Sequence, residues 1–213
     1  AASLPRREGS SNPLRSTLLE HDVVGRLPDD VYEAVRADPA LLYEVVHSLL
    51  QSHFAESLHD DILSAVGLSI DVGVVGHRRR DPKFRDRVLR AYEHRCAICG
   101  FQAHLGHVDI GLEAAHIRWH QAGGDDDEPN GLALCVMHHK LFDRGALTVA
   151  EEDLTVQVSQ HVHGGSGFEE WVTGFHGQPL RTPQHPDYRP APANLSWHWR
   201  QVFRQPPRWV GVR

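Results

Sequence analysis

The sequence is poor in the features that mark secreted or membrane-spanning proteins. It has only three cysteines in 213 residues, too few for the disulfide framework of a small extracellular domain. It has no apolar run of ~18 residues, the length that indicates a membrane span, and its first residues lack the apolar core of a signal peptide. We therefore expect a protein of the reducing cytoplasm, with no membrane partner, whose cysteines are available as metal ligands.

A large positive charge is also missing. The formal net charge is -6, so the total charge gives no sign of a nucleic-acid partner. The charge is distributed unevenly along the chain. Residues 77–95 contain eight Lys or Arg and three acidic residues, whereas residues 125–128 are all acidic. A basic segment in an acidic protein can bind a polyanion locally, or it can be a solvated helix face. The apolar content of 40% is enough for the core of one domain or two small ones.

The first third of the chain shows three short helical patterns. Pro28-Asp29-Asp30 predicts the start of one helix and Asp38-Pro39 the start of a second, while Ser57 is expected to cap a third that ends at Gly67. The apolar residues of these segments recur every three or four positions, which indicates a small helical bundle. Residues 68–80, with their glycines and arginines, are interpreted as a linker.

The rest of the chain mixes helical and extended patterns. Asp81-Pro82 predicts the start of a helix. The segments that follow are a strand over 108–116, a loop over 117–130, the start of a helix over 132–141, a hairpin of 147–149 with 154–158, and helices over 168–175 and 193–203. This order predicts an α+β fold.

All three cysteines fall into one metal-binding pattern. Cys96 and Cys99 form a C-x-x-C knuckle, and Cys135 with His138 forms a second knuckle of the same spacing. Two such knuckles supply the four thiolate and imidazole ligands that Zn²⁺ prefers in a structural site. The 35 residues between the knuckles are too many for a compact ribbon, so a folded segment must lie there. The alternative is that Cys135 is a buried core thiol and that the C-x-x-C spacing of Cys96 and Cys99 occurs by chance.

Three further side chains lie within or beside these knuckles. His116 ends a strand-like segment, and an imidazole can activate water at neutral pH. His139 follows the zinc-type ligand His138, and because helical neighbours point about 100° apart, it can hold a separate catalytic ion such as Mg²⁺ or Mn²⁺. The amide of Asn130, before Gly131, can pin the loop. The set predicts hydrolysis of a phosphodiester by an activated water.

Each of these residues taken alone has a simpler interpretation. His116 fits a core or turn histidine, and Asn130-Gly131 fits a turn or a helix cap. His139 could replace His138 on the structural ion. Their occurrence together, in this order and bracketed by the cysteines, favours the catalytic interpretation.

One series of motifs resembles the HNH endonuclease family. It reads Cys96-x-x-Cys99 … Leu112-Glu-Ala-Ala-His116-Ile … Asn130-Gly-Leu-Ala-Leu-Cys135-x-x-His138-His139-Lys-Leu-Phe-Asp143-Arg-Gly145. The resemblance implies a zinc-stapled ββα-metal domain with its core in residues 82–160. It also implies that His116 is the general base, that Asn130 orients the loop and that His139 binds the catalytic divalent ion.

The sequence departs from this family at one position. Many members carry Asp or His directly before the base, as a second metal ligand, whereas this chain has Ala115. The shell of the catalytic ion is therefore open to three interpretations. Its second ligand is Glu113, or it is Asp143, or the ion is completed only by water and the substrate phosphate.

A closer resemblance extends to both sides of this core. Residues 41–67, with Ser52-His-Phe54 and Ser57-Leu-His-Asp-Asp-Ile-Leu, look like the end of the sulfur-recognition domain of phosphorothioated-DNA-dependent type IV restriction endonucleases. The segments that start at Arg80-Asp-Pro and at Gly177-Gln-Pro-Leu look like the rest of these enzymes. The resemblance implies a helical domain over residues 1–76, then a nuclease domain over residues 77–213 that includes a C-terminal helical extension.

The implied function is cleavage of double-stranded, phosphorothioated DNA. Basic residues near the site are then expected to contact phosphates without reading sequence: Arg78, Arg79, Arg80, Lys140 and Arg144. Nicks on opposite strands need two active sites, which makes a homodimer a further expectation. Two alternatives stay open. One is an HNH nuclease of a mobile element, phage or toxin that acts on unmodified DNA, and the other is a non-catalytic zinc module that binds DNA or protein.

Overall fold

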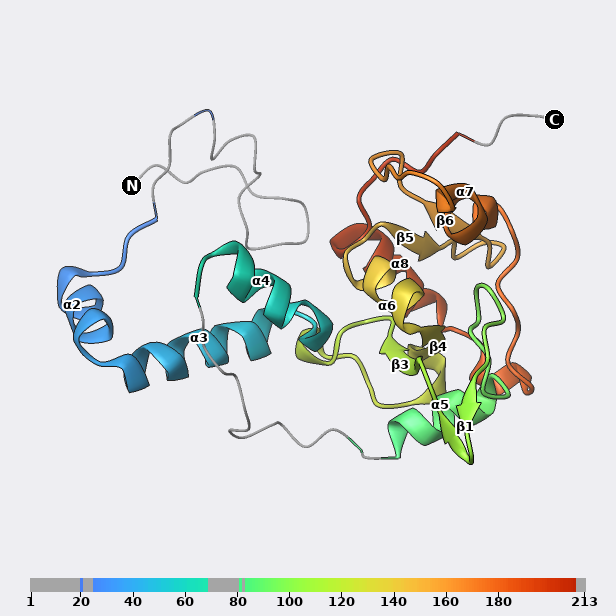
Figure 1. The fold of residues 1–213 in the computed structure, drawn as a ribbon, viewed down its shortest axis with the longest axis horizontal. Helices are drawn as coiled ribbons and strands as arrows, with labels where there is room; N and C mark the ends of the chain where they lie inside the picture. Colours follow the sequence, from blue (N-terminus) through green and yellow to red (C-terminus); the bar gives the residue numbers. More distant parts are fainter. Residues whose placement is uncertain (1–19, 21–24, 69–80, 82, 210–213) are drawn as a thin grey trace. The chain divides into compact units, whose positions relative to one another are not determined.

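The computed structural model describes residues 20, 25–68, 81 and 83–209 (Figure 1). It divides into two compact units, Ala1–Val45 and Val46–Arg213. The candidate DNA contacts Arg78, Arg79 and Arg80, with most of the expected linker, lie outside the described residues. Within the described ranges, every helix is too short or too polar to cross a bilayer.

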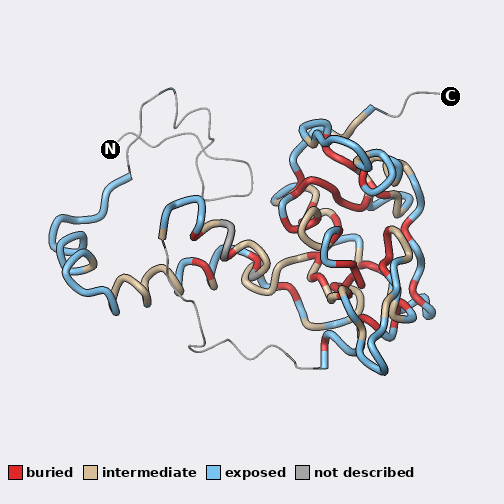
Figure 2. The backbone as a smooth tube through the Cα atoms, in the orientation of Figure 1, coloured by how far each residue is buried: buried red, intermediate tan, exposed pale blue. Residues whose placement is uncertain are grey.

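Two helices make up most of the described residues before position 54. They are α2 (Asp29–Ala37) and α3 (Pro39–His53). The carboxylate of Asp38 caps α3 by accepting hydrogen bonds from the N–H groups of Ala40 and Leu41, as a helix start at this position predicts. None of the nine residues described in α2 is buried, and α3 buries only Leu50 (Figure 2). The helical periodicity is present, but these two helices enclose little core of their own.

The third helix, α4 (His59–Ala65), begins later than predicted. It follows the 3-10 turn η1 (Glu56–Leu58), and Ser57 does not cap it. The Ser57 hydroxyl instead donates a hydrogen bond to the carboxylate of Asp143. The predicted cap is therefore wrong, because a carboxylate from a distant part of the chain takes the same hydroxyl. Gly67 ends the helical segment in the left-handed conformation, with φ at 70°, as predicted.

The centre of the second unit is a β-hairpin followed by a helix. Strand β3 (Leu112–His116) pairs antiparallel with β4 (Gly131–Cys135), and α6 (Val136–Asp143) follows directly. In the register of the hairpin, Leu112 lies opposite Cys135 and His116 opposite Gly131. Helices α5 (Phe84–Ala91) and α6 both contact this hairpin (Figure 1). The predicted α+β fold with a ββα core is confirmed.

Two segments near this core differ from the sequence-based prediction. Residues 108–116 are not one strand, because β2 (Val108–Asp109) pairs with β1 (His104–Leu105) and Gly111, with φ at 69°, separates it from β3. Residues 132–135 belong to β4 and do not start a helix. All five residues of β4 are buried, so its apolar run has no alternation, and its pairing with β3 decides its structure.

The remaining elements complete the core. They are η2 (His120–Ala122), η3 (Glu128–Asn130), β5 (Leu147–Val149), β6 (Val156–Val158), α7 (Phe168–Trp171), η4 (Thr173–Phe175), η5 (Pro186–Tyr188) and α8 (Pro192–Gln201). The β5–β6 hairpin and the final helix agree with the prediction, whereas Val172 divides the expected helix over 168–175. Buried apolar residues from α5, α6, α8 and the two larger hairpins form one cluster (Figure 2). Full burial of a side chain such as Phe142 stabilises the fold by about 2–3 kcal/mol.

Candidate metal centre and histidine cleft

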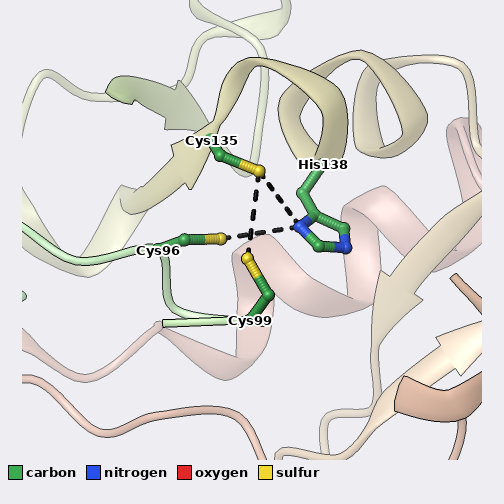
Figure 3. A group of neighbouring side chains, drawn as sticks. All are labelled: Cys96, Cys99, Cys135 and His138. Carbon is green, nitrogen blue, oxygen red and sulfur yellow. Dashed lines mark hydrogen bonds between the residues drawn. The ribbon is translucent and has the colours of Figure 1, made fainter. Parts of the chain in front are cut away.

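Three cysteines and one histidine converge beside the β3–β4 hairpin (Figure 3). Cys96 and Cys99 lie in the loop after α5, Cys135 ends β4, and His138 lies in the first turn of α6. One ligand atom from each residue lies within 4.8 Å of the others. Gly100 follows the first knuckle with φ at 75°, and its N–H donates to the carbonyl of Cys96 at 2.8 Å, which closes the turn.

The distances in this Cys₃His cluster fit a tetrahedral zinc ion. The sulfurs of Cys99 and Cys135 are 4.0 Å apart, and Nδ1 of His138 lies 3.2 Å from the Cys135 sulfur and 3.6 Å from that of Cys96. Zn–S bonds of about 2.3 Å and Zn–N bonds of about 2.0 Å place neighbouring ligand atoms roughly 3.5–3.8 Å apart. The cluster is therefore compatible with structural zinc. No other group of three or more potential ligands gathers this closely within the described residues.

The surroundings of the cluster favour an ionised Cys96 beside a positive charge. Nε2 of His138 lies 3.0 Å from the carbonyl oxygen of Trp171, which holds a proton on Nε2 and directs Nδ1 at the sulfurs. Hydrogen bonds with the thiol of Cys135, the thiol of Cys99 and the ring of His138 lower the pKa of Cys96. Burial disfavours a charged His138, but the neighbouring sulfurs outweigh it and raise the pKa of this histidine to about 9. A thiolate at Cys96 thus favours a cation beside it, either a proton on the His138 ring or a zinc ion that displaces this proton.

A second group of side chains lines a cleft of about 310 Å³. His116 lies at the end of β3, and His139 lies on α6 directly after the cluster residue His138. Because neighbouring helical residues point about 100° apart, His138 can face the sulfurs while His139 faces the cleft. The structure therefore brings together the two imidazoles that the sequence predicts for the catalytic site, next to the cluster.

The imidazole ring of His116 is held by a contact at one nitrogen and by a second contact on its face. Its Nε2 lies 2.8 Å from a carboxylate oxygen of Asp126, in the loop between β3 and β4. Its ring stacks on Phe84, at the start of α5, with centroids 4.0 Å apart and planes 14° from parallel. The ring of His120 approaches edge-on at 6.0 Å. These contacts leave the imidazole little freedom to rotate.

Asn130 connects both ends of the loop that follows β3. Its Oδ1 accepts a hydrogen bond from the N–H of Arg118 at 2.8 Å, and its Nδ2 donates to the carbonyls of Arg118 and Asp125 at 3.0 and 2.8 Å. The side chain is fully buried, so these bonds are shielded from water. Gly124 is required here, because a Cβ atom would lie 1.9 Å from the Arg118 carbonyl oxygen. The amide thus fixes the loop that carries Asp126.

His139 lies between two carboxylates. Its Nδ1 is 2.6 Å from Glu113 on β3, and its Nε2 is 3.2 Å from Asp143, one turn further along α6. Burial disfavours a charged His139, but Asp143 and then Glu113 raise its pKa to about 9. The hydrogen bond from His139 lowers the pKa of Glu113 in turn. Asp143 is buried, whereas the Glu113 side chain is 46% exposed and faces the cleft.

The other predicted site residues have different positions. Ala115 is fully buried in the apolar cluster, where its methyl group offers no ligand atom. Lys140 is half-buried on α6, and Arg144 is exposed just after this helix. Neither basic residue is among those that line the cleft. Their role as phosphate contacts stays a prediction.

Sequence reasoning missed Phe84 and Asp126 as parts of this site. Phe84 fits the apolar face of α5, and nothing in its spacing indicates a stacked imidazole. Asp126 belongs to the acidic run over 125–128, which was interpreted only as a feature of the charge distribution. The order Gly-Gly-Asp-Asp-Asp before Asn130 could have pointed to a turn that returns a carboxylate to the end of β3.

Comparison with known proteins gives two matches to family models. Residues 96–150 match the model described as HNH endonuclease, and residues 2–71 match the model described as ScoMcrA-like, DNA sulfur-binding domain. A solved structure titled "Modification dependent TagI restriction endonuclease" is 28% identical, with a TM-score of 0.46. The alignment covers 65% of this chain and 42% of that chain. No curated protein gave a match.

The cluster and the two cleft histidines, His116 and His139, lie within the residues that match the HNH endonuclease model. This region is preceded in the same chain by a segment that matches a DNA sulfur-binding domain, so the predicted resemblance is confirmed for both parts. The chain spans about two fifths of the length of the solved restriction endonuclease that it matches.

Proposed function

We propose that this chain is a metal-dependent endonuclease that hydrolyses phosphodiester bonds in double-stranded, phosphorothioate-modified DNA. The observation that carries the nuclease activity is the cleft that holds both His116 and His139, beside a Cys₃His cluster. The match of residues 2–71 to a DNA sulfur-binding domain supports the choice of modified DNA. An enzyme that restricts such DNA would act in the cytoplasm.

His116 is the proposed general base. It takes a proton from a water in line with the scissile bond, and the resulting hydroxide oxygen forms a bond to phosphorus. The bond between phosphorus and the leaving sugar oxygen breaks, and this oxygen keeps the electron pair and takes a proton from solvent. Asn130 contributes by fixing the loop whose Asp126 carboxylate contacts His116.

The catalytic divalent ion, Mg²⁺ or Mn²⁺, is expected at His139 and Glu113. Nδ1 of His139 and the Glu113 oxygen are 2.6 Å apart. Two neighbouring ligand atoms on one Mg²⁺ ion lie about 3 Å apart, so a small outward movement would admit the ion. Asp143 contacts the other ring nitrogen of His139, Nε2. From this side of the ring it would orient His139 and would not ligate the same ion. When bound, the ion would stabilise negative charge on the phosphate and the leaving oxygen.

The Cys₃His cluster is proposed to hold a structural zinc ion. All four ligands come from the chain, and their spacing leaves no open position for water or substrate. The ion would join the loop after α5 to the β4–α6 junction and so hold the hairpin that carries His116. Its role is therefore to stabilise the domain, with no direct part in the reaction.

DNA binding is proposed to use phosphate contacts made by basic side chains. Lys140 on α6 and Arg144 just after it are two candidates, and the sequence of residues 78–80 supplies three further arginines. A single cleft cuts one strand at a time, so we expect a homodimer when both strands are cut. Sedimentation of the protein with and without a modified duplex would test this expectation.

The test of the proposed function is cleavage of two matched plasmids. One carries phosphorothioate linkages and the other does not, and each is incubated with the protein and Mg²⁺ or Mn²⁺. We expect nicked and linear products from the modified plasmid only, and none when EDTA is present. Equal cleavage of both plasmids would favour an HNH nuclease for unmodified DNA. Binding without cleavage of either plasmid would favour a non-catalytic zinc module, to which the non-ligating Ala115 already lends some support.

A further inference from the structure

The carboxylate of Asp126 makes a close contact with the proposed base. Its Oδ1 lies 2.8 Å from Nε2 of His116. The two side chains are only 16% and 11% exposed, so water does not screen the contact as it would at the surface. Asp126 lies in the loop between β3 and β4, two strands that Figure 1 shows side by side.

Asp126 is itself held in place by contacts from Arg87 on α5 and from Asp81, three residues before this helix begins. Its second oxygen, Oδ2, accepts a hydrogen bond from the N–H of Asp81 at 2.9 Å. Its backbone carbonyl accepts a hydrogen bond from the guanidinium of Arg87, which also pairs with Asp81 at 2.7 Å and with Glu128 at 3.3 Å. The carboxylate therefore does not depend on His116 for its position.

The electrostatics of the site favour an ionised Asp126. Burial alone would raise the pKa of Asp126, but the hydrogen bonds from Asp81 and His116 outweigh it, and the net pKa is lowered. His120 also faces the pair, with Nε2 3.8 Å from Oδ2 of Asp126, and the charge of the Arg87 guanidinium interacts with the same carboxylate. A carboxylate accepts hydrogen bonds and cannot donate them, so the proton between Asp126 and His116 belongs to the imidazole.

We infer that Asp126 is the positioning residue of His116, and that it selects the tautomer in which Nε2 carries the proton and Nδ1 is the basic nitrogen. This inference rests on the proposed function of His116. The stacked Phe84 fixes the plane of the ring, and Asp126 fixes its rotation within that plane. When Nδ1 takes the proton from water, the ring becomes a cation, and the ionised carboxylate stabilises it without accepting the proton.

The test compares two asparagine variants of adjacent residues. In D126N the amide can donate to Nε2 of His116, which favours a proton on Nδ1 and removes the basic nitrogen from its working position. We expect the single-turnover cleavage rate to fall by about 100-fold or more, with DNA affinity and zinc content unchanged. The matched control is D125N, because the Asp125 side chain is exposed and only its backbone carbonyl contacts Asn130. We expect D125N to cleave like the parent chain.

A second measurement reads the tautomer directly. Nitrogen-15 NMR of the histidine rings, with H116A used to assign the His116 signals, should show a protonated Nε2 in the parent chain. In D126N these signals should shift toward the form with the proton on Nδ1, and the acidic limb of the rate profile should move to lower pH. The inference is overturned if D126N cleaves within threefold of the parent rate, or if the parent chain carries its proton on Nδ1. The NMR result needs no cleavage, so it stands even if the protein cuts no DNA and the proposed function fails.

Discussion

His138 and His139 are neighbours in sequence, yet they belong to two different environments. His138 is fully buried and faces three sulfurs, with its remaining nitrogen on the carbonyl of Trp171. His139 faces two carboxylates beside a cleft. The pKa of each histidine is raised to about 9, by the cysteines at His138 and by the two carboxylates at His139. The comparison teaches that the groups around an imidazole decide which role it can take. The first histidine belongs to a closed site with four potential protein ligands, whereas the second belongs to an open site that lines a cleft.

The largest expected effect comes from breaking the closed site. In C96S one thiolate is lost, and because structural zinc contributes about 10 kcal/mol or more to folding in small domains, we expect the nuclease domain to unfold or to melt far below the parent chain. Metal analysis should find less than one zinc ion per chain, and circular dichroism should report the loss of structure. H139A is the matched control and should keep both its zinc and its fold. A folded C96S that retains zinc would show that the closed site is assigned wrongly.

The next largest effect is expected at the open site. In H116A the proposed base is lost, so the cleavage rate should fall by about 10²–10⁴-fold. Because His116 lies in the cleft and is not one of the four residues of the cluster, zinc content and DNA affinity should not change. Single-turnover cleavage and fluorescence anisotropy measure the two properties separately. Cleavage at the parent rate would contradict the role of His116.

A smaller effect should separate the metal ions of the two sites. In E113Q the cleft loses a negatively charged ligand, so we expect Mn²⁺ to bind about tenfold more weakly or worse, while zinc stays bound. Calorimetric titration of the zinc-loaded protein with Mn²⁺, without DNA, measures this directly. E152Q changes an exposed glutamate outside the cleft and serves as the control. Unchanged Mn²⁺ affinity in E113Q would leave Asp143, or water and phosphate alone, as the partners of His139.

The basic residues next to the open site should change binding more than chemistry. We expect the double variant K140A/R144A to bind DNA several-fold more weakly, because two phosphate contacts are lost. The slope of log affinity against log salt should fall in magnitude by about 1–2. The cleavage rate at saturating DNA should stay near that of the parent chain. A salt slope identical to that of the parent chain would mean that these residues do not contact phosphates.

A third histidine sharpens the comparison, since burial outweighs the effect of charged neighbours on its pKa. His198 is fully buried between Thr148 and the carbonyl of Phe142, and burial lowers its pKa to about 3. The unfolded chain takes up this proton near pH ~6.5, so the stability that His198 contributes is complete above that pH and is lost as the pH falls toward 3. In H198Q the unfolding free energy should therefore depend less on pH between 6.5 and 4, by up to about 1.4 kcal/mol per pH unit. Urea unfolding at several pH values measures the difference, and parallel curves for both proteins would contradict the expectation.

The sequence predicted the closed site more completely than the open one. The spacing of Cys96, Cys99, Cys135 and His138 is sufficient to predict a cluster, because zinc ligands follow local rules along the chain. The pairing of His116 with His139 also follows from the motifs. The Gly-Gly-Asp-Asp-Asp run indicates a turn with carboxylates, but it does not indicate that Asp126 is the one that reaches His116. That choice depends on a loop conformation fixed by Asn130 and Gly124.

Secondary structure was predictable where local signals are strong. Asp38 and Gly67 mark helix ends in the structure as they do in the sequence. Strand β4 was not predictable, because an apolar run that is buried on both faces fits a strand or a helix equally well. Only its pairing with β3 distinguishes the two structures. Ser57 failed as a helix cap for a related reason, since a distant partner, Asp143, takes its hydroxyl.

Both sites draw on a single short helix, and this limits how the segment can change in length. Cys135, His138, His139 and Asp143 reach their partners only in their present phase along α6. Inserting or deleting one residue among them would turn every later side chain by about 100° and remove both sites at once. Length variation is compatible with both sites only elsewhere, for example at the exposed tip of the β1–β2 hairpin around Gly106, where an added Cβ would meet nothing.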